Sequence, residues 1–473
     1  MKKINPLKNR ILLIIALALC CVKLSAQNII TFTWQIPYAY SHEIYIYIDK
    51  SFEINWGDGQ TENYTGDVLE LKHTYATQGE YLVSITADQD CEYIEFECNN
   101  ANITDLNVND CNALTLLSCS RNQLTQLNIT SPNLEELYCH NNQLTQLNIT
   151  SPNLKGLYCP YNQLTQLNIM SGLEWLECSH NQLTQLDIYF LQYLDCSYNQ
   201  LTQLNMMFPL SGYLQYLYCN NNQLTELHLG YPELKDVNCS YNQLTQLNIR
   251  FSNLQELDCS HNQLTQLNIE SLELWDLYCD NNKLQLSDLY ALHLLYAETY
   301  KVFGAQNLSP RWTNVNTELF ASQSQFNGIY TQYIVEINGA PAPNSSYTVT
   351  NGKLTFHTPG IYTVTMTNAA IVSNYPAKVT VPLEVVPVGI SENDLADLKV
   401  YPNPTAGELR MENGELRIEN VEVFDVYGRK LSSNHLIPTS SNHLINISHL
   451  QAGVYFVRIQ TETGVITKKI IKL

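Results

Sequence analysis

Apolar residues return at fixed positions through the central part of this chain. One turn of the pattern reads Leu134-x-x-Leu137-x-Cys139-x-x-Asn142-x-Leu144, and its cysteine recurs about every twenty residues. An internal repeat of this length predicts a solenoid, in which each turn packs only on its neighbours. The cysteines that mark the turns are Cys98, Cys119, Cys139, Cys159, Cys178, Cys196, Cys219, Cys239, Cys259 and Cys279.

Each turn contains one short strand around its Leu-x-Cys segment. Because side chains alternate along a strand, we expect Leu137 and Cys139 to point inward and Tyr138 and His140 to point outward. Copies of the strand should pair in register as a parallel sheet. The rest of the turn, from Leu144 onward, has too few residues for a long helix, so we expect it to be extended or 3₁₀.

An asparagine follows three residues after nearly every one of these cysteines. Its amide can satisfy buried backbone groups of the turn, and losing it should cost roughly 1–3 kcal/mol. The first turn has Ala101 at this position, which predicts looser hydrogen bonding there. The asparagines are Asn122, Asn142, Asn162, Asn181, Asn199, Asn222, Asn242, Asn262 and Asn282.

Two turns differ in length. The turn from Cys178 to Cys196 is two residues short, and the turn from Cys196 to Cys219 has three extra residues around 206–209. Both changes fall between one strand and the next, in the loop on the far side. We therefore expect the strand register to be unaffected.

The repeated phrase resembles the leucine-rich repeat. A cysteine replaces the third leucine, as in the cysteine-ladder repeats of internalin-like bacterial surface proteins. The resemblance implies a right-handed solenoid over 91–286 with a parallel sheet on its concave side. We call the outward side of these strands the strand face.

Residues 27–90 alternate apolar and polar positions, as in Glu43–Ile48 and Tyr81–Ile85, which predicts short antiparallel strands. The segment Trp56-Gly57-Asp58-Gly59, with His73-Thr74-Tyr75, resembles a PKD-like β-sandwich. Asp58 and Gly59 are expected to form a turn. A catalytic or metal-binding role for Asp58 and His73 is the less favoured reading.

The pattern changes after the repeats. Residues 287–305 contain apolar residues at helical spacing after Ser287, which predicts an amphipathic helix capped by that serine and closing the end of the solenoid. Alternation and Asn-Gly turns then predict an immunoglobulin-like β-sandwich over 306–387. The expected fold class is therefore mainly β, a solenoid flanked by immunoglobulin-like β-sandwich modules.

A linker, 388–396, precedes the last segment. There, Val400-Tyr401-Pro402-Asn403-Pro404, Val423–Arg429 and Gly453–Ile459 occur in order. These motifs resemble the type A C-terminal sorting domain of the type IX secretion system of Bacteroidetes, over 397–473. The resemblance implies export to the cell surface through the periplasm, with the type IX secretion machinery as a partner.

The start of the chain supports export. Residues 1–26 have basic residues, then the apolar run Ile11–Cys21, then Leu24-Ser25-Ala26, which predicts a signal peptide. Leu19 is bulky where lipid attachment at Cys20 would need a small residue, which disfavours a lipoprotein. No later stretch is apolar enough to span a bilayer. The formal charge of -20, about -25 without the signal segment, argues against nucleic acid as a partner.

Fourteen cysteines in an exported chain would ordinarily suggest disulfides. Ten of them occupy one inward column, where in-register parallel neighbours rarely offer disulfide geometry. Buried thiols are the favoured reading, with sporadic disulfides or a soft-metal site as alternatives. Cys91 and Cys111 lie outside the column and could pair with each other.

The sequence contains no catalytic signature such as H-E-x-x-H or G-x-S-x-G, no glycine-rich phosphate loop, and no requirement for a cofactor, so we do not expect an enzyme. The strand face instead suggests binding. Its outward rows hold many carboxylates and aromatic rings and no Lys or Arg. The candidate binding residues are Glu136, Tyr138, Tyr158, Trp175, Glu177, Tyr193, Asp195, Tyr216, Tyr218, Asp236, Asp258 and Tyr278, with Glu95, Glu97, Glu256, Asp276 and Asp280 adding to the acidic rows.

Rigid aromatic side chains and carboxylates together suit a protein or peptide partner of basic character, in adhesion at the cell surface. Glycan capture is an alternative, because exposed rings can also stack on sugars. A third reading is a structural spacer, in which tyrosine is a good strand residue and acids keep the surface soluble. The sequence does not separate these readings.

Overall fold

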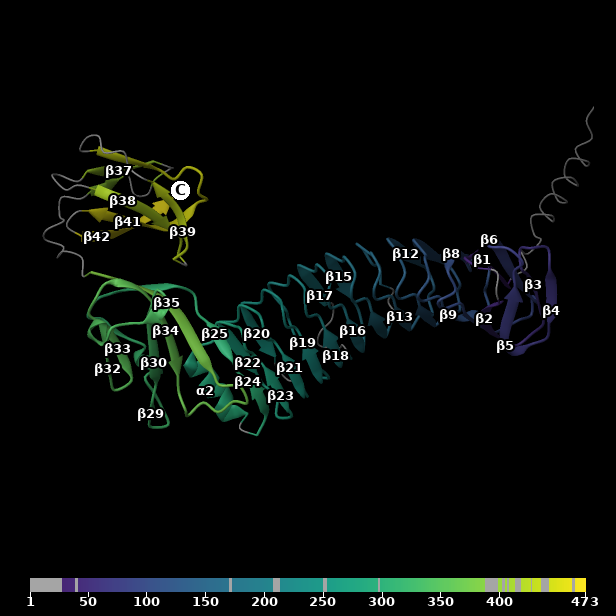
Figure 1. The fold of residues 1–473 in the computed structure, drawn as a ribbon, viewed down its shortest axis with the longest axis horizontal. Coiled ribbons are helices and arrows are strands. Elements are labelled where there is room, and N and C mark those ends of the chain that lie inside the picture. Colours follow the sequence, from purple (N-terminus) through teal and green to yellow (C-terminus); the bar gives the residue numbers. More distant parts are fainter. Residues whose placement is uncertain are drawn as a thin grey trace, which may run out of the picture. The chain divides into compact units, whose positions relative to one another are not determined.

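The computed structural model describes residues 28–387 except 39–40, 170–171, 207–212, 250–252 and 297, and in the C-terminal segment residues 399–401, 405, 408–412, 418–426, 428–434, 442–461 and 464–473. Strands dominate, which confirms the mainly β fold class (Figure 1). The predicted signal peptide, 1–26, and linker, 388–396, lie outside the described residues. The chain divides into two compact units, 1–279 with 298–300 and the remaining residues, and each is described by itself.

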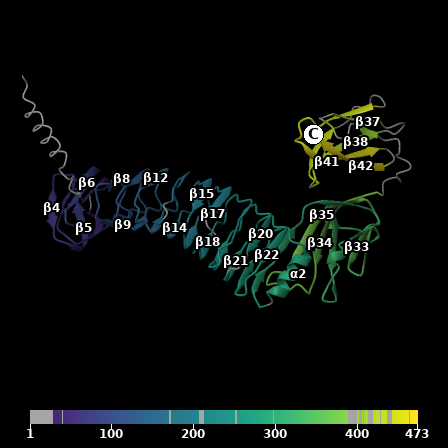
Figure 2. The same cartoon turned by 180° about the vertical axis from the view of Figure 1, so that it is seen from behind.

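A parallel sheet of short strands runs through the first unit, one strand per turn, which confirms the solenoid (Figures 1 and 2). In β11, Leu137 is buried while Glu136 and Tyr138 are partly exposed, as the alternation predicts. The strands are β7 (Ile94–Glu97), β9 (Leu114–Ser118), β11 (Glu136–Tyr138), β13 (Gly156–Tyr158), β14 (Trp175–Glu177), β16 (Tyr193–Asp195), β18 (Tyr216–Tyr218), β19 (Asp236–Asn238), β21 (Glu256–Asp258) and β23 (Asp276–Tyr278).

The return segments of the turns are extended, which is one of the two conformations expected for them, extended or 3₁₀. They form parallel pairs, β10 with β12, β15 with β17, and β20 with β22. We call their outward side the back face. These strands are β10 (Gln126–Ile129), β12 (Gln146–Ile149), β15 (Gln185–Ile188), β17 (Gln203–Met206), β20 (Gln246–Ile249) and β22 (Gln266–Ile269).

The asparagine column links successive turns, as predicted. Asn142 accepts a hydrogen bond from the Leu124 backbone N–H at 3.1 Å and donates to the carbonyls of Cys119 and Cys139 at 3.0 and 3.1 Å. Each amide therefore satisfies buried groups of its own turn and of the turn before it. The turn with Ala101 has no such amide of its own, and its backbone N–H donates to Asn122 at 3.1 Å.

The two turns of unusual length keep the strand register, which confirms that prediction. Trp175 of β14 pairs with Tyr193 of β16, and Tyr193 pairs with Tyr216 of β18. The three buried leucines between these outward residues and the cysteines therefore stay in line.

The N-terminal strands are antiparallel, as predicted, and they continue into the solenoid. Strand β2 pairs with β5 and with β7, while β1 pairs with β6 and with β8. Since β7 also pairs with β9, one sheet crosses the predicted boundary between 90 and 91 without a break. The strands are β1 (Asn28–Ile36), β2 (Ser41–Ile48), β3 (Phe52–Asn55), β4 (Thr61–Tyr64), β5 (Asp67–Thr74), β6 (Gly79–Ala87) and β8 (Ile103–Asn107).

The Asp-Gly turn after β3 forms as expected. Gly57 and Gly59 have φ of 81° and 93°, and Asp58 Oδ1 accepts from the Gln60 backbone N–H at 3.0 Å. Asp58 also contacts His73 Nε2 at 2.8 Å. The His73 ring stacks on Trp56 at 4.6 Å, so this pair forms part of the local packing.

In the second unit, the predicted helix forms as α2 (Leu286–Leu295). The prediction that Ser287 caps it is wrong. The N-cap is Gln285, two residues before Ser287, and the Gln285 backbone N–H donates to the Asp288 carboxylate at 2.9 Å. The amphipathic description is also wrong. Leu289 is buried, but Leu294 and Leu295 are exposed, so apolar side chains occur around the helix.

The segment after α2 contains the predicted strands, and both Asn-Gly turns have positive φ at Asn338, Gly339, Asn351 and Gly352. The elements are β24 (Tyr300–Val302), β25 (Ala305–Asn307), β26 (Arg311–Asn314), β27 (Glu318–Leu319), η2 (Ala321–Gln323), β28 (Gln325–Phe326), β29 (Ile329–Tyr330), β30 (Gln332–Ile337), β31 (Ala340–Pro341), η3 (Asn344–Ser346), β32 (Tyr347–Thr350), β33 (Lys353–Phe356), β34 (Gly360–Thr367) and β35 (Lys378–Val386).

The C-terminal strands are antiparallel around their own apolar core, which includes Leu409, Val423 and Val457. They are β36 (Lys399–Tyr401), β37 (Glu408–Glu412), β38 (Ile418–Phe424), β39 (Lys430–Asn434), β40 (Asn442–Asn446), β41 (Gly453–Thr461) and β42 (Gly464–Lys472).

Candidate functional site

All twelve predicted binding residues lie on the strand face, in two rows that run across the strands. The first row precedes the buried leucine of each strand and the second row follows it. The first row holds Glu136, Trp175, Tyr193, Tyr216 and Asp236, and the second row holds Tyr138, Tyr158, Glu177, Asp195, Tyr218, Asp258 and Tyr278.

The aromatic rings of the strand face stack on one another. Tyr138 and Tyr158 lie with centroids 4.3 Å apart and planes 4° apart, and Trp175 and Tyr193 lie 4.2 Å and 3° apart. Tyr216 is tilted by 40° from Tyr193. In each pair one ring face is covered by the partner ring, so the pairs present mainly ring edges and hydroxyl groups outward.

Carboxylates lie next to one another toward the later turns. Asp236, Glu256 and Asp276 are in register on β19, β21 and β23. Burial raises the pKa of Asp236, and burial together with the two neighbouring carboxylates raises the pKa of Glu256. Of the lysines and arginines that the structure describes, none forms an ion pair with these three carboxylates.

Two tyrosine hydroxyls of the strand face are engaged by carboxylates. The Tyr218 hydroxyl donates to Asp236 at 2.6 Å, and the Tyr138 hydroxyl donates to Glu136 at 3.3 Å. Beside the second row, the buried Ser197 Oγ donates to Asp195 at 2.6 Å. The Trp175 indole N–H is buried and has no hydrogen-bond partner among the described residues.

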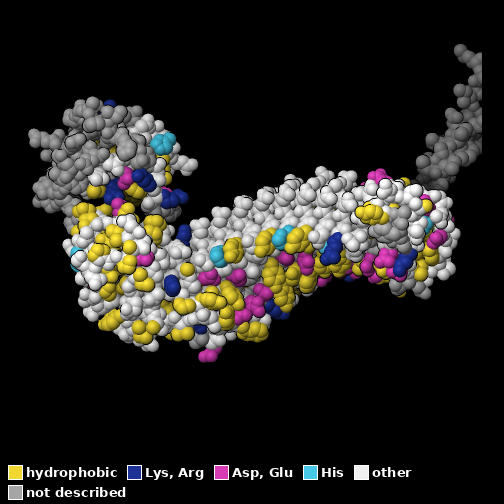
Figure 3. Space-filling view, in the orientation of Figure 1, with side chains coloured by type: hydrophobic (Ala, Val, Ile, Leu, Met, Phe, Trp, Pro, Cys, Tyr) yellow, Lys and Arg dark blue, Asp and Glu magenta, His cyan; other side chains and the backbone are white. Residues whose placement is uncertain are grey.

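The back face differs in chemistry. Figure 3 shows acidic and hydrophobic side chains gathered over β16, β18, β21 and β23, and mostly uncharged polar surface over β12, β15 and β17. Its asparagines pair with each other: Asn148 donates to Asn128 at 2.7 Å and Asn268 donates to Asn248 at 2.7 Å. Amide groups satisfy both donor and acceptor needs within this ladder.

Sequence reasoning missed a second aromatic row, two residues after the cysteines. Tyr161, His180 and Tyr198 stack with centroids 4.1 and 4.2 Å apart, and Tyr241 stacks on His261 at 4.0 Å. All five have positive φ between 52° and 55°, which side chains other than Asn or Gly seldom adopt. The available signal was the choice of Tyr and His where other turns have Asn141 or Asn221.

The cysteines of the column are buried and carry free thiols. Burial raises the pKa of Cys119 and of Cys159 to about 12, so these thiols stay protonated. Cys91 and Cys111 are also free, and the Cys91 thiol donates to Asp49 at 2.9 Å. The disulfide between Cys91 and Cys111 that the sequence allowed is therefore not formed.

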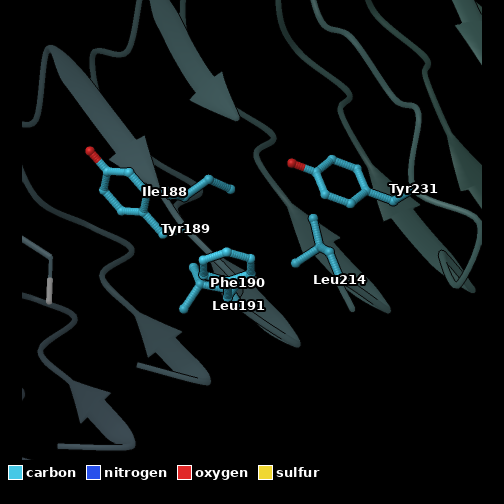
Figure 4. A pocket seen from close by; sticks show the side chains of 6 residues that line it. All are labelled: Ile188, Tyr189, Phe190, Leu191, Leu214 and Tyr231. Atoms are coloured by element: carbon cyan, nitrogen blue, oxygen red, sulfur yellow. The ribbon is translucent and has the colours of Figure 1, made fainter. Parts of the chain in front are cut away.

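Two pockets lie away from the twelve candidate residues. The smaller has a volume of about 10 Å³, room for roughly one water molecule. Figure 4 shows the side chains that line it, Ile188, Tyr189, Phe190, Leu191, Leu214 and Tyr231. The larger, about 510 Å³, is an open hollow of the back face lined by Asp187, Tyr189, Gln203, Leu204, Asn205, Glu226 and His228. Within the part of the chain that is described, His, Cys, Asp and Glu form no group of three suited to a metal ion. No described helix is both long and apolar enough to cross a membrane.

Comparison with protein families gives two matches. Residues 399–473 match the secretion system C-terminal sorting domain, and residues 253–275 match the leucine-rich repeat. The first match confirms the sorting-domain prediction and indicates export to the outer surface or secretion. The second agrees with the solenoid that the strands build. A search of curated proteins finds no match.

Solved structures with leucine-rich repeats resemble the chain. YopM from Yersinia enterocolitica is 23% identical over 46% of this chain and 60% of that one, with a TM-score of 0.31. The leucine-rich effector YopM of Yersinia pestis is 27% identical over 40% and 55%, with a TM-score of 0.36. A leucine-rich repeat protein of Leptospira interrogans is 18% identical over 43% and 82%, with a TM-score of 0.25. The chain thus spans less than two thirds of either YopM structure.

Proposed function

We propose that this chain is a secreted or cell-surface binding protein that presents its strand face to a protein partner. One observation carries the proposal: the strand face holds Asp236, Glu256 and Asp276 side by side without an ion-pair partner among the described lysines and arginines, while asparagines of the back face pair with one another. A partner with basic side chains would supply the missing donors and charge. Leucine-rich repeat solenoids are typical protein-interaction modules, which supports the same reading.

The ring geometry favours a protein over a glycan. Sugar recognition by aromatic residues uses the open face of a ring, and stacking within the Tyr138–Tyr158 and Trp175–Tyr193 pairs covers one face of each ring. Ring edges and hydroxyls suit the mixed contacts of a protein surface. In this proposal the PKD-like segment 27–90 and the immunoglobulin-like segment 306–387 are spacers around the solenoid, and 388–396 links them to the sorting domain.

A double variant tests the strand face. Trp175→Ala with Tyr216→Ala should abolish most partner capture from surface-protein extracts, since buried aromatic anchors contribute about 1–3 kcal/mol each. The melting temperature should fall only slightly, because the lost contact is one ring stack on Tyr193. A glycan array on the same protein decides between the two partner classes.

The matched control is Tyr161→Ala with Tyr198→Ala, which removes rings stacked on His180 in the other aromatic row. It should bind like the unmodified chain. Capture that survives the first variant and is lost in the control would move the site to that other row. Binding to an arrayed glycan that the first variant abolishes would make the glycan the ligand.

Export is tested by deletion of residues 397–473. The truncated chain should accumulate in the periplasm, because the sorting domain addresses it to the outer surface. Cell fractionation and surface protease digestion measure this. Surface exposure equal to that of the full chain would contradict the assignment of the sorting signal to these residues.

A further inference from the structure

The outward residues of the back face depart from the repeat at one place. Through the turns from β10 to β22, the outward pair is a glutamine and an asparagine, as in Gln126 and Asn128. The departures are Asp187 in β15, and Glu226 and His228 two turns later. These three are therefore the titratable side chains of the two outward rows over these turns.

The departures coincide with a break in the backbone ladder of this face. Asp187 of β15 is in register with Asn205 of β17. Among the described strands, β17 has no second partner, and the turn after it pairs with β20 only at the isolated bridge Leu229–Ile249. The turn that carries three extra residues also lies here. Strand pairing therefore does not join β17 to the segment around Glu226.

The open hollow of about 510 Å³ lies at this break, and we call it the back-face hollow. Asp187, Glu226 and His228 all line it. Its apolar lining is Leu204, which is partly exposed, whereas the corresponding leucines of the other turns, such as Leu127, are buried. The hollow therefore exposes the edge of the core. Its volume lies in the range of small-molecule binding sites.

An aromatic ring contributes to the same hollow. Tyr189 directly follows β15, and its side chain is half-buried. It also lines the small cavity, where Figure 4 shows its ring directed away from Phe190 and Leu191. Unlike the paired rings of the strand face, Tyr189 stacks on none of the described rings. Its ring faces are therefore not covered by another described aromatic side chain.

The polar groups of the back-face hollow include both donors and acceptors. Asn205 Nδ2 donates to one Asp187 carboxylate oxygen at 2.6 Å, which holds these two side chains together. The Glu226 carboxylate and His228 Nε2 are 3.9 Å apart, too far for a hydrogen bond. None of the described lysines and arginines forms an ion pair with Asp187 or Glu226. Carboxylate oxygens, an imidazole and the Gln203 amide therefore face the hollow as hydrogen-bonding groups.

We propose that the back-face hollow binds a neutral oligosaccharide. This ligand and this face lie outside the proposed function, which concerns a protein on the strand face. Each sugar hydroxyl both donates and accepts a hydrogen bond, which matches a lining of carboxylates, amides and one imidazole. The apolar face of a sugar ring suits an uncovered aromatic ring such as Tyr189.

Other ligands match the back-face hollow less well. A metal ion would need three suitable ligands close together, and the described His, Cys, Asp and Glu form no such group. An anionic ligand would be repelled by Asp187 and Glu226. A cation would gain little from Glu226, whose side chain is 66% exposed, and would offer no acceptor to the Gln203 amide. An apolar ligand would cover carboxylates without supplying donors.

The test uses the full chain and saturation-transfer difference NMR with a panel of soluble oligosaccharides. The neutral members are di- to tetrasaccharides of glucose, galactose, mannose and N-acetylglucosamine. At least one of them should receive saturation from the protein. A sialylated trisaccharide, which adds a negative charge, should receive less. Isothermal titration calorimetry then gives the affinity of the neutral oligosaccharide with the strongest signal.

Asp187→Ala with His228→Ala should weaken that oligosaccharide about tenfold, because two hydrogen-bonding partners are removed. Both side chains are exposed, so the variant should fold like the unmodified chain. Asn128→Ala with Asn248→Ala is the matched control. It removes exposed side chains from the same row in turns outside the hollow, and it should leave the affinity unchanged.

A second pair of variants separates the ring of Tyr189 from its hydroxyl. Tyr189→Phe keeps the ring and should retain the affinity within about threefold, whereas Tyr189→Ala should weaken binding about tenfold. Thermal melting shows whether each variant is folded. Equal losses in two folded variants would overturn the stacking of a sugar ring on Tyr189.

No saturation of any neutral oligosaccharide would overturn the proposal, as would an affinity that Asp187→Ala with His228→Ala leaves unchanged. Binding that the Trp175→Ala, Tyr216→Ala variant abolishes would also overturn it, because the sugar would then lie on the strand face. Partner capture tests the proposed function separately, and the Asp187→Ala, His228→Ala variant should leave that capture intact. The two proposals therefore fail independently.

Discussion

The strand face and the back face are built from the same turns, yet they differ in how fully their polar groups are satisfied. On the back face, Asn148 donates to Asn128, and the same contact recurs between Asn268 and Asn248. On the strand face, Asp236 and Glu256 stand side by side in register. In-register pairing amplifies whatever residue is repeated, so amides form a ladder and carboxylates form a repulsive row.

The comparison also shows where the repeats vary. The back segment reads Gln-Leu-Asn-Ile in β10, β12, β20 and β22. The first row of the strand face instead reads Glu136, Gly156, Trp175, Tyr193 and Tyr216 along consecutive strands. A solenoid needs its core and its turns, and the strand face contributes to neither. Variation on that face is what a recognition surface requires.

The largest expected effect is on stability, and it comes from the buried asparagine column that supports both faces. Asn142→Ala should lower the free energy of unfolding by about 2 kcal/mol, because the buried Leu124 N–H would lose its acceptor. The Cys119 and Cys139 carbonyls would each lose one of two amide donors, since Asn122 and Asn162 also donate to them. Urea denaturation of the full chain measures it. Asn128→Ala on the back face should change stability by less than about 0.5 kcal/mol. Similar losses in both would show that the exposed ladder also supports the fold.

Periodicity was sufficient to predict the solenoid, its inward cysteines and its asparagine column. These follow from side-chain alternation and from the need to satisfy buried backbone groups, and both act within one turn. The helix cap could not be predicted in the same way. Ser287 is a good capping residue, but the helix is capped two residues earlier, by Gln285 together with Asp288.

The candidate site was predictable in membership and not in geometry. The alternation identifies Tyr138 and Trp175 as outward, but ring stacking depends on which side chains occupy the neighbouring strands. The stacked row at Tyr161 and His180 depends on a left-handed backbone that no local signal other than Asn marks elsewhere.

An effect of intermediate size is expected on the rate of association when carboxylates are removed from one face or the other. Asp236→Asn with Glu256→Gln should slow association of a basic peptide about tenfold at low salt, and the difference should shrink near 1 M salt. Stopped-flow fluorescence measures the rate. Asp187→Asn with Glu226→Gln removes the same formal charge from the back face and should have little effect. Equal slowing in both variants would assign the steering to net charge and not to the strand face.

The smallest expected effect is the pH dependence of stability. The pKa values of Glu177, Asp236 and Glu256 are raised, chiefly by burial, so their contribution to stability is complete below the unfolded value near 4 and is lost as pH rises through the folded values. Asp58 behaves in the opposite way. Burial alone would raise its pKa, but hydrogen bonds from His73 and Gln60 lower it overall. The contribution of Asp58 to stability is therefore present above the pKa of the unfolded chain and is lost only as the pH falls through the lower folded pKa.

Acidification from pH 7 to pH 4.5 should therefore let these partly exposed carboxyl groups raise the melting temperature by about 1 °C. Burial lowers the pKa of His140 and of His293, so these two residues act in the opposite direction, and equally in the full chain and in the variants below. Differential scanning calorimetry of the full chain measures it. The Asp236→Asn, Glu256→Gln variant should lose most of this rise, because neither neutral side chain titrates, while Asp187→Asn with Glu226→Gln should keep it. A rise that both variants retain would place the responsible carboxyls outside the acidic row, and the contrast between the two faces would then rest on binding alone.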